Sequence, residues 1–330
     1  MNVLNDINMK ILVTGGAGFI GSKLVYELCE QGRNVTIIDN LNEYYNPQLK
    51  QDRLDKFCGK ANFMKGDIAD RQTVEDLFSI YKFDKVVNLA AQAGVRYSID
   101  HPYDYINSNI VGFLNILEAC RHNGVKHLIY ASSSSVYGMT KEQPFTEEQK
   151  IDKPVSLYAA TKKSNELMAH SYTKLYGLPT TGLRFFTVYG PYGRPDMSPT
   201  LFADAITQGK ELKVFNNGEM YRDFTYIDDI VNGIVAIVNG EQKLNEDNLP
   251  YGIYNIGCGH KEKLMDFITL IEKSLGKEGN KVFLPMQPGD VEVTYASTEL
   301  LERDFGYKPK ITINEGIPRF IEWYKKYNNI

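Results

Sequence analysis

A glycine-rich turn near the N-terminus is the feature that most constrains the fold of this chain. Residues 15–21 (GGAGFIG) directly follow an apolar run at residues 10–14 and open an amphipathic stretch. Glycine permits a sharp turn and a close approach of the backbone to a pyrophosphate, which then rests on helix N–H groups. Placed between a strand and a helix, such a turn is typical of a dinucleotide-binding βαβ unit.

The first half of the chain alternates short apolar runs with amphipathic stretches, which predicts a parallel sheet flanked by helices. Glycines 32, 124 and 177 are expected to end helices, because glycine readily adopts the left-handed conformation found there. The expected strands are 10–14, 34–39, 61–65, 85–88, 126–131, 180–184 and 252–256. The expected helices are 19–31, 71–81, 103–123, 157–176 and 229–239.

These elements predict an α/β fold: a Rossmann-type doubly wound parallel sheet with a smaller, mixed α/β C-terminal domain. The alternation fades after Arg184 into a Gly/Pro-rich stretch, and the tail from about His260 mixes helices with short strands. We expect a dinucleotide-binding domain over residues 1–188, to which 225–258 return. Residues 189–224 and 259–330 are expected to form the substrate domain.

Composition excludes several classes of protein. A formal charge of −4 over 330 residues gives no electrostatic reason to expect nucleic acid or an anionic membrane as partner. No apolar run approaches the ~20 residues of a membrane span, and residues 1–10 lack the order of a secretory signal. The four cysteines have no C-x-x-C spacing, which indicates reduced thiols. We therefore expect a cytoplasmic protein.

An acid at the end of the second expected strand predicts which dinucleotide binds. A carboxylate at Asp39 can accept hydrogen bonds from the adenosine ribose hydroxyls and repel a 2′-phosphate. The next two residues, Asn40 and Leu41, offer no cation for such a phosphate. The sequence therefore predicts NAD rather than NADP.

Two further strand ends belong to the predicted cofactor site. Asp67 and Ile68 follow the third strand, where an acid can meet the adenine edge; alternatively, Asp67 or Asp70 caps the next helix. Small residues after Asn88 leave room for a flat ring near the backbone. The predicted cofactor-binding residues are Gly15, Gly18, Phe19, Ile20, Gly21, Asp39, Asn40, Asp67, Ile68, Leu89, Ala90 and Ala91, with Tyr158 and Lys162 below.

A tyrosine and a lysine four residues apart supply candidate acid–base chemistry. Of three such pairs, only Tyr158 and Lys162 lie within one expected helix, where positions i and i+4 share a face. A phenol has a pKa of about 10, and a nearby ammonium lowers it by favouring the phenolate. The other pairs, Tyr81/Lys85 and Tyr137/Lys141, cross a helix end and a glycine turn.

Serines 132–135 end the fifth expected strand, just before the helix that carries Tyr158. Ligands of a doubly wound sheet bind beyond the carboxyl ends of its strands. A serine cluster at this place can present hydroxyl groups to a substrate oxygen. The alternative interpretation of the four serines is a solvated loop.

Together these motifs resemble the extended short-chain dehydrogenases/reductases, in particular the nucleotide-sugar epimerases and dehydratases. The resemblance runs from about Met9 to the C-terminus. It implies that Tyr158 takes the proton from the sugar O4 and that Ser133 hydrogen-bonds O4. It also implies that Lys162 lowers the pKa of Tyr158 and holds the nicotinamide ribose. Family members form homodimers through helices that correspond to residues 103–123 and 157–176.

Missing acids narrow the reaction that the resemblance implies. Dehydratases of this family carry an Asp-Glu pair where this chain has Ser134 and Ser135. Nucleotide-uronate decarboxylases typically place a glutamate at the position of Ser135. A non-catalytic NAD-sensing regulator would be expected to lose Tyr158 or Lys162. These departures favour a 4-epimerase, in which the 4-keto intermediate is simply reduced again.

The run at residues 184–197 (RFFTVYGPYGRPDM) closely resembles the signature of UDP-glucuronate 4-epimerases. In that subfamily the residues at Thr187 and Arg194 meet the sugar carboxylate, and guanidinium does pair well with carboxylate. Alternatively, Arg194 forms a loop ion pair with Asp196 or Asp204. The segment around Arg96 also matches the subfamily, although this arginine could instead serve the fold.

The remaining substrate contacts rest on the same resemblance. Arg222 and Asp290 correspond to the family's diphosphate and ribose contacts, and Gln287 replaces an arginine of the UDP-galactose epimerases. The other enzyme candidates are a UDP-glucose or UDP-N-acetylglucosamine 4-epimerase and, with less support, a UDP-glucuronate decarboxylase. The predicted substrate-binding residues are Ser133, Ser134, Arg96, Thr187, Arg194, Arg222 and Asp290.

Overall fold

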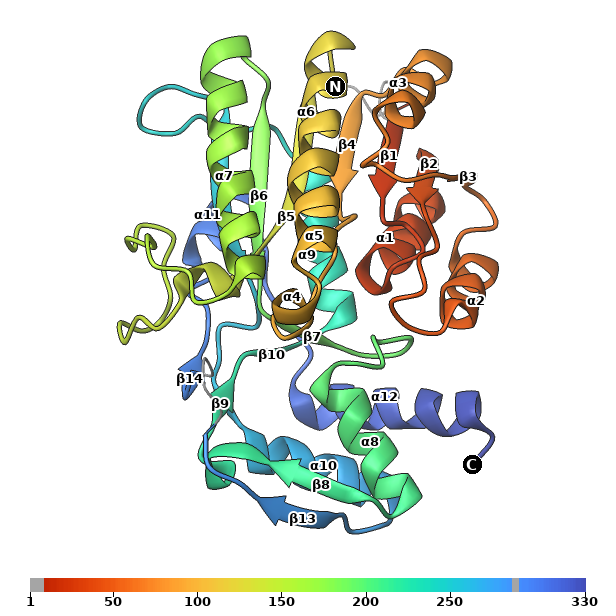
Figure 1. The fold of residues 1–330 in the computed structure, drawn as a ribbon, viewed down its shortest axis with the longest axis vertical. Helices are drawn as coiled ribbons and strands as arrows, with labels where there is room; N and C mark the ends of the chain where they lie inside the picture. The colour runs from red at the N-terminus through yellow and green to blue at the C-terminus, as the bar shows by residue number, and fades with distance from the viewer. Residues whose placement is uncertain (1–8, 287–290) are drawn as a thin grey trace.

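The computed structural model describes residues 9–286 and 291–330. Its main sheet contains seven parallel strands: β1 (Lys10–Thr14), β2 (Asn34–Asp39), β3 (Asn62–Lys65), β4 (Lys85–Asn88), β5 (His127–Ser133), β6 (Thr180–Phe185) and β11 (Tyr251–Ile256). Their order across the sheet is β3-β2-β1-β4-β5-β6-β11 (Figure 1). Strands β1 to β3 are added toward one edge of the sheet and β4 to β6 toward the other, so the strand order reverses between β1 and β4, and a doubly wound sheet binds ligands at that point.

Side chains along each strand alternate between two helical layers. In β1, Ile11 and Val13 pack into the core shared with α1 (Phe19–Glu30) and α9 (Ile227–Asn239). Leu12 faces the opposite layer, formed by α3 (Arg71–Ile80), α6 (Gly112–His122) and α7 (Leu157–Tyr176). Because both faces are covered, the strands are almost continuously apolar, as expected for a parallel sheet.

Several shorter elements connect the strands at the edge where ligands bind. The helix α2 (Pro47–Phe57) follows β2 and packs against α1. After β4, the short helices α4 (Tyr97–Asp100) and α5 (Pro102–Tyr105) lead through a π-helical segment, η1 (Ile106–Val111), into α6. A single 3₁₀ turn, η2 (Ser134–Tyr137), ends β5.

A smaller body lies beyond the carboxyl ends of the sheet strands, in the lower part of Figure 1. Its helices are α8 (Ser198–Gln208), α10 (Leu264–Leu275) and α12 (Ile313–Asn328), of which α10 packs on both α8 and α12. The helix α11 (Glu299–Phe305) packs instead on β11 and α9 of the first body. Its strands pair in short ladders: β7 (Thr187–Tyr189) with β10 (Phe224–Tyr226), β8 (Glu211–Val214) with β13 (Asn280–Phe283), and β9 (Tyr221–Arg222) with β12 (Glu262–Lys263) and β14 (Val293–Thr294). A 3₁₀ segment, η3 (Phe215–Gly218), follows β8.

The predicted fold class is confirmed: the protein has a Rossmann-type doubly wound parallel sheet. All seven predicted strands are present with boundaries shifted by at most two residues, while the predicted helix 103–123 is interrupted by the π-helical segment η1. The return of β11 to the sheet edge beside β6 brings residues after 225 back to the first body. The domain limits at residues 188, 224 and 258 stay a prediction. Within the described residues, no helix is long and apolar enough to cross a membrane.

Candidate active site

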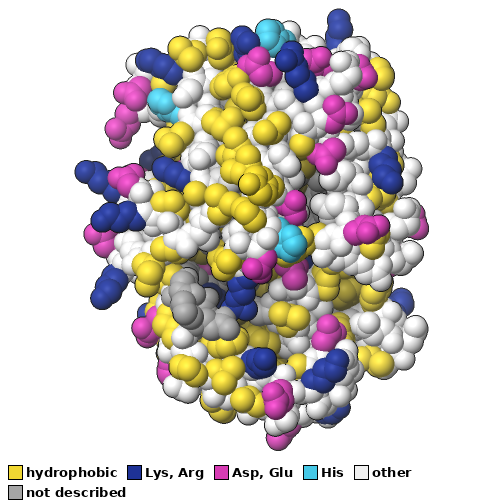
Figure 2. Space-filling view, in the orientation of Figure 1, with side chains coloured by type: hydrophobic (Ala, Val, Ile, Leu, Met, Phe, Trp, Pro, Cys, Tyr) yellow, Lys and Arg dark blue, Asp and Glu magenta, His cyan; other side chains and the backbone are white. Residues whose placement is uncertain are grey.

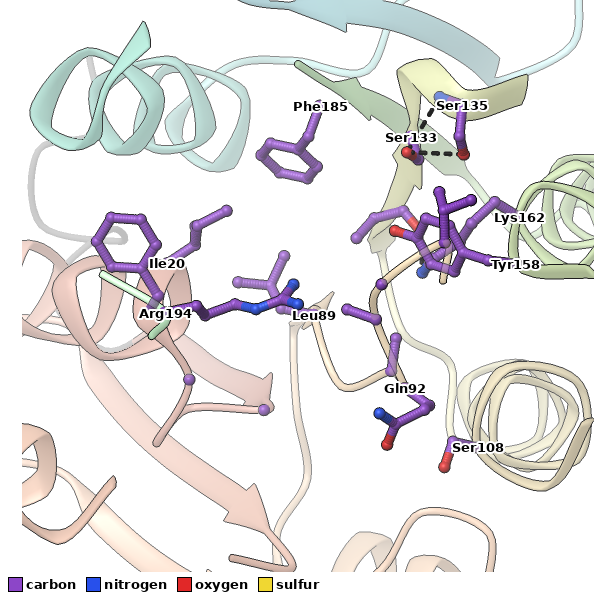
Figure 3. A pocket seen from close by; sticks show the side chains of 18 of the residues that line it. Ile20, Leu89, Gln92, Ser108, Ser133, Ser135, Tyr158, Lys162, Phe185 and Arg194 are labelled. Atoms are coloured by element: carbon purple, nitrogen blue, oxygen red, sulfur yellow. Dashed lines mark hydrogen bonds between the residues drawn. The ribbon is translucent and has the colours of Figure 1, made fainter. Parts of the chain in front are cut away.

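A cavity of about 620 Å³ opens beyond the carboxyl ends of the sheet strands and extends to the smaller body (Figure 3). This volume suits a ligand of cofactor or nucleotide size. Asp290 and Gln287 lie outside the described residues. All the other predicted site residues line this cavity: Gly15, Gly18, Phe19, Ile20, Gly21, Asp39, Asn40, Asp67, Ile68, Leu89, Ala90, Ala91, Arg96, Ser133, Ser134, Tyr158, Lys162, Thr187, Arg194 and Arg222.

The glycine-rich turn forms one end of the cavity and leaves no room for side chains. Gly15 has a φ of +68° and donates its N–H to the Ile38 carbonyl at 2.8 Å. A Cβ added at Gly15 would lie 2.7 Å from the Ala90 nitrogen, and one at Gly21 would lie 2.2 Å from the Gly15 carbonyl oxygen. Glycine is therefore required here by close backbone packing as well as by the positive φ.

The first turn of α1 offers its backbone N–H groups to the cavity. Gly18 is the N-cap and supplies no side-chain hydrogen bond, and the first turn contains no acidic residue. The N-terminus of a helix carries unpaired N–H groups and a partial positive charge, which suit a phosphate. The residues of this turn therefore fit the pyrophosphate of a dinucleotide.

Asp39 lies beside this turn and is held in place by the backbone. Its carboxylate accepts hydrogen bonds from Ala17 N at 3.1 Å and from Leu41 N at 2.9 Å. Only 9% of the residue is exposed, and it lines the cavity. A carboxylate fixed in this way, at the end of β2, fits ribose hydroxyl groups that approach from the cavity.

Asp67 does not cap the helix that follows it. Asp70 is the N-cap of α3 and accepts from Gln72 N at 3.2 Å. Asp67 instead accepts from Ala69 N at 2.8 Å and from the Asn40 side chain at 2.9 Å, so that it joins the ends of β2 and β3 at the cavity wall. The sequence left open whether Asp67 or Asp70 caps this helix, and the structure shows that the cap is Asp70.

Two cavity residues, Lys50 and Tyr44, were missed from the sequence. The Lys50 ammonium donates to the Asn42 carbonyl at 2.7 Å and to its side-chain oxygen at 2.6 Å, and burial lowers the pKa of Lys50. The sequence does contain a signal for the helix that carries Lys50: Asn46 caps α2 and Pro47 is its first residue, a common helix start. That start predicts a helix whose first turns adjoin the glycine-rich turn.

Tyr158 and Lys162 project from the first turns of α7 into the cavity (Figure 3). Ser156 caps this helix by accepting from Ala159 N at 3.1 Å, which fixes where the i and i+4 pair starts. Lys162 is only 4% exposed, and its ammonium donates to the Ala131 carbonyl of β5 at 2.9 Å. The same ammonium lies 6.0 Å from the centre of the Tyr158 ring.

Burial dominates the protonation of both groups. It raises the pKa of Tyr158 above its ordinary value, against the lowering effects of a hydrogen bond from Ser133 and of the Arg194 charge. It lowers the pKa of Lys162 to about 8. The direction for Tyr158 is thus opposite to the expected lowering of its pKa, because burial outweighs the effects that favour the phenolate.

The four serines at the end of β5 have separate surroundings. Ser132 is buried and donates to Glu166 Oε1 at 2.7 Å, in contact with the ion pair that Glu166 forms with Arg184. Ser133 accepts hydrogen bonds from the nitrogen and the hydroxyl of Ser135 at 3.2 and 3.0 Å, and it faces the cavity (Figure 3). The cluster is therefore part of the site and not a solvated loop.

Acidic side chains are nearly absent from the cavity wall. Among residues 9–286 and 291–330, only Asp39 and Asp67 contribute carboxylates to it, and both lie at the glycine-rich end. The positions of Ser134 and Ser135, where related dehydratases carry acids, present only hydroxyl groups. No described carboxylic acid is thus available in the wall beside Tyr158.

Arg194 reaches the cavity from the loop after β7 and is already paired. Its Nε and Nη2 donate to the two carboxylate oxygens of Asp196 at 3.0 and 2.5 Å. The ion-pair alternative foreseen for Arg194 is therefore present, with Asp196 as partner. Figure 3 shows the guanidinium pointing into the cavity all the same.

The other expected substrate residues come from three segments around the cavity. Thr187 opens β7, where its N–H donates to the Asp223 carbonyl at 3.2 Å. Arg222 on β9 donates from Nη1 to the Tyr221 and Glu292 carbonyls at 2.8 and 3.0 Å. Arg96 lies 5.6 Å from the centre of the Phe215 ring, so it connects the two bodies.

The two rejected Tyr/Lys pairs have other functions in the fold. The Tyr137 hydroxyl is buried, where it donates to Asn255 and accepts from Arg184. The Lys85 ammonium donates to the Val238 carbonyl at 2.6 Å, at the end of α9. Neither pair lines the cavity within the described residues.

Comparison with protein families gives a match over most of the chain. Residues 11–257 match the NAD-dependent epimerase/dehydratase family. A probable UDP-glucuronate 4-epimerase of Rhizobium meliloti is 42% identical over 331 residues, which cover 96% of this chain and 97% of that protein.

Solved structures give the same family and two different sugars. A Bacillus cereus UDP-glucuronic acid 4-epimerase, in complex with UDP-glucuronic acid and NAD, is 34% identical with a TM-score of 0.88; the match covers 97% of this chain and all of that one. A Thermotoga maritima UDP-glucose 4-epimerase with UDP-glucose is 31% identical with a TM-score of 0.87, at the same coverage.

Proposed function

The chain belongs to the NAD-dependent epimerase/dehydratase family, and on that premise we propose that it is a UDP-glucuronate 4-epimerase. It interconverts UDP-glucuronate and UDP-galacturonate through a transient 4-keto sugar and keeps its NAD bound throughout. The choice of a uronate rests on one observation. The Arg194 guanidinium lines the cavity, and the described part of the wall has no acid beside Tyr158. The protein is an NAD-dependent nucleotide-sugar epimerase, an isomerase.

The glycine-rich end of the cavity is where NAD would be held. The first turn of α1 would bind its pyrophosphate, and Asp39 its adenosine ribose. Asp67 and Ile68 would lie at the adenine, and the small residues from Leu89 to Ala91 would border the nicotinamide. When bound, the cofactor supplies the acceptor and donor for the hydrogen at the sugar C4.

Tyr158 is the proposed base and acid of the reaction. As base it takes the proton of the sugar O4, and as acid it returns that proton when the ketone is reduced. Ser133 donates a hydrogen bond to O4 and holds it near the phenol. Lys162 supports this exchange as a buried cation, because a positive charge favours the phenolate.

The ketone formed at C4 has no described acid that could divert it. Elimination of water needs an acid and a base beside the sugar, and Ser134 and Ser135 offer only hydroxyl groups. The intermediate is therefore reduced again, and if the sugar has turned its other face, the product is the C4 epimer. The hydrogen that leaves C4 returns to C4.

A uronate adds a hazard that the site must control. A 4-keto uronate is a β-keto acid, which loses CO₂ when the C5–C6 bond to its carboxylate aligns with the π system of the C4 carbonyl. Arg194 and Thr187, which both line the cavity, would hold the carboxylate so that this bond stays near the carbonyl plane. Guanidinium binds carboxylate through two parallel hydrogen bonds, which fixes the plane of the group as well as its position.

The experiment that tests this function offers UDP-glucuronate and UDP-glucose side by side to the purified protein without added NAD. We expect conversion of UDP-glucuronate to UDP-galacturonate and little or no turnover of UDP-glucose. Preference for the neutral sugar would contradict the role of Arg194. Release of a UDP-pentose as main product would indicate a decarboxylase instead.

The neutral-sugar epimerase is the second candidate because the structural likeness does not separate the two. The TM-scores to the UDP-glucuronic acid and UDP-glucose enzymes are 0.88 and 0.87. The chemistry favours the uronate, since its carboxylate would form charge-assisted hydrogen bonds with the Arg194 guanidinium and a neutral hydroxymethyl group would not. A non-catalytic sensor of NAD would bind the cofactor and leave both sugars unchanged.

We also propose that two copies of the chain associate through one helical face. A band of exposed apolar side chains runs over the helices of this face, as Figure 2 shows. Patches of this kind on a soluble domain commonly mark an interface. Leu167→Glu should therefore lower the sedimentation mass of the protein from dimer to monomer. The exposed residues are Tyr103, Ile106, Val111 and Leu114 before and within α6, and Leu167, Leu175 and Tyr176 on α7.

The thiols support a cytoplasmic location, which we propose on the chemistry of the cysteines. All four are free in this structure, and Cys29, Cys58 and Cys120 are buried. Proteins of oxidising compartments usually pair such residues in disulfides. Detection of a disulfide in the purified native protein would contradict this location.

A further inference from the structure

Arg194 has two edges that can each bind a carboxylate, and the protein already occupies one of them. Asp196 receives Nε and Nη2, which form the side edge of the guanidinium. The other edge is made of Nη1 and the second N–H of Nη2, and the guanidinium also has a side-chain hydrogen bond with Tyr44. Because the guanidinium lines the cavity, this end edge is the one available to a ligand.

Asp196 is in turn held by Tyr44, a residue of the loop after β2. The Tyr44 hydroxyl donates to Asp196 Oδ2 at 2.9 Å, and its ring centre lies 5.8 Å from the Arg194 guanidinium carbon. The same ring packs edge-to-face on Tyr97 at 4.7 Å between centres. This series of side-chain contacts thus connects Arg194, on the loop after β7, to two loops of the first body.

A glycine makes room for this chain of contacts. Gly94 has a φ of +103°, and a Cβ there would lie 2.9 Å from the Tyr44 hydroxyl and 3.8 Å from Arg194 Nη2. The loop after β4 therefore lies directly against the tyrosine and the guanidinium. Three segments, after β2, β4 and β7, limit where the guanidinium can move.

Charge explains why the pair is stable at the cavity wall. The side chains of Arg194 and Asp196 are 20% and 31% exposed. Burial by itself lowers the pKa of an arginine, but Asp196 more than offsets this and keeps the pKa of Arg194 above its ordinary value. Arg194 likewise lowers the pKa of Asp196, although burial acts in the opposite direction. Both groups are charged at neutral pH.

We propose that Asp196 and Tyr44 are positioning residues for Arg194, which fix its side edge so that the end edge presents two parallel donors to the substrate carboxylate. This inference rests on the proposed function, since it concerns the uronate carboxylate. It adds two residues, Tyr44 in the cavity wall and Asp196 outside it, that act through the orientation of the guanidinium. Fixing the guanidinium plane also fixes the plane of the carboxylate bound to it.

The orientation controls a side reaction that can be measured. When the carboxylate is misaligned at the 4-keto stage, the C5–C6 bond breaks and CO₂ leaves. The electron pair of that bond passes into the C4 carbonyl to form an enolate, which then takes a proton at C5. The product is a UDP-4-keto-pentose, with no change in oxidation state beyond the oxidation that already occurred at C4.

The test compares Asp196→Asn, Tyr44→Phe and Arg194→Gln with the unmodified protein, all given UDP-glucuronate. The readout is the fraction of oxidised sugar that ends as CO₂ and UDP-4-keto-pentose. Asp196→Asn should raise this fraction about tenfold, because one charge-assisted hydrogen bond is lost and an amide N–H faces the guanidinium. Tyr44→Phe keeps the ring and should raise the fraction less, in the same direction.

Controls separate this inference from the proposed function. Affinity for UDP, which lacks the carboxylate, should stay within about twofold in both variants. Tyr26→Phe is the matched control, since Tyr26 lies outside the cavity wall and its ring packs edge-to-face on Phe57 at 5.9 Å between centres. If Arg194→Gln raises CO₂ release but Asp196→Asn and Tyr44→Phe do not, the positioning role is wrong and the proposed function stands. If Arg194→Gln changes neither epimerisation nor CO₂ release, the proposed function itself is wrong.

Discussion

The two ends of the cavity are built in different ways. The glycine-rich end uses backbone groups and the carboxylates of Asp39 and Asp67, all from elements near the start of the chain: the turn after β1, the first turn of α1 and the ends of β2 and β3. The sugar end uses side chains from α7, β5, the loop after β7 and β9. Its residues are far apart in the chain and meet only when both bodies have assembled.

The difference predicts different consequences of mutation. At the glycine-rich end the backbone atoms that line the site are also packed tightly in the fold, so a change there should reduce stability and cofactor binding together. At the sugar end the side chains project from elements that other contacts stabilise. A change there should alter the chemistry and leave the fold and the bound cofactor in place.

The largest effect is expected at the sugar end, for Tyr158→Phe. Removing the phenol oxygen removes the proposed base, so kcat should fall about 10³-fold. The ring and its packing remain, so the thermal midpoint and the content of bound NAD should stay as in the unmodified protein. Steady-state kinetics, a thermal melt and a cofactor assay on one preparation test this. Turnover comparable to the unmodified enzyme would contradict the role of Tyr158.

At the glycine-rich end, Gly15→Ala should reduce both stability and NAD content. Its Cβ would lie 2.7 Å from Ala90 N, which adds about 2 kcal/mol of overlap to the cost of the positive φ. Gly32→Ala is the matched control, because Gly32 has a similar φ of +76° and nothing within 4 Å of the added Cβ. The control should lose about 1 kcal/mol and keep its NAD. Equal losses in the two variants would show that close packing does not matter at Gly15.

A smaller effect is expected where the two ends meet, at Lys162. Burial lowers the pKa of Lys162 to about 8, so its ammonium is present below that pH and is lost above it. Because the cation supports the phenolate of Tyr158, kcat/KM should fall as the pH rises through about 8. The pH–rate profile of the purified enzyme measures this limb. A rate that keeps rising well above pH 9 would contradict a need for the ammonium.

The glycine-rich end was largely predictable from sequence because its signals are local. The turn and the acid at Asp39 both lie within a few residues of the elements they define. Local periodicity likewise placed the seven sheet strands. The helix α2 was the exception. Its Asn46-Pro47 start is a local signal, but the expected helices did not include it, and so Lys50 on this helix and Tyr44 just before it were missed.

The sugar end could be assigned only in part, since its geometry depends on distant residues. Nothing near Arg194 in the chain shows that Tyr44 would hold its partner Asp196 from 152 positions away. The short strands of the smaller body also pair with distant segments, as β8 (Glu211–Val214) does with β13 (Asn280–Phe283). Two to four residues carry too weak a pattern to predict such a ladder.

One measurement tests the central claim most directly. The purified protein, without added NAD, is given UDP-glucuronate that carries deuterium at C4, and the products are followed by NMR and mass spectrometry. Return of the same hydrogen within a single site predicts UDP-galacturonate that retains deuterium at C4, with almost no UDP-pentose. Loss of the label from C4, a UDP-pentose as main product, or no epimer at all would contradict the account.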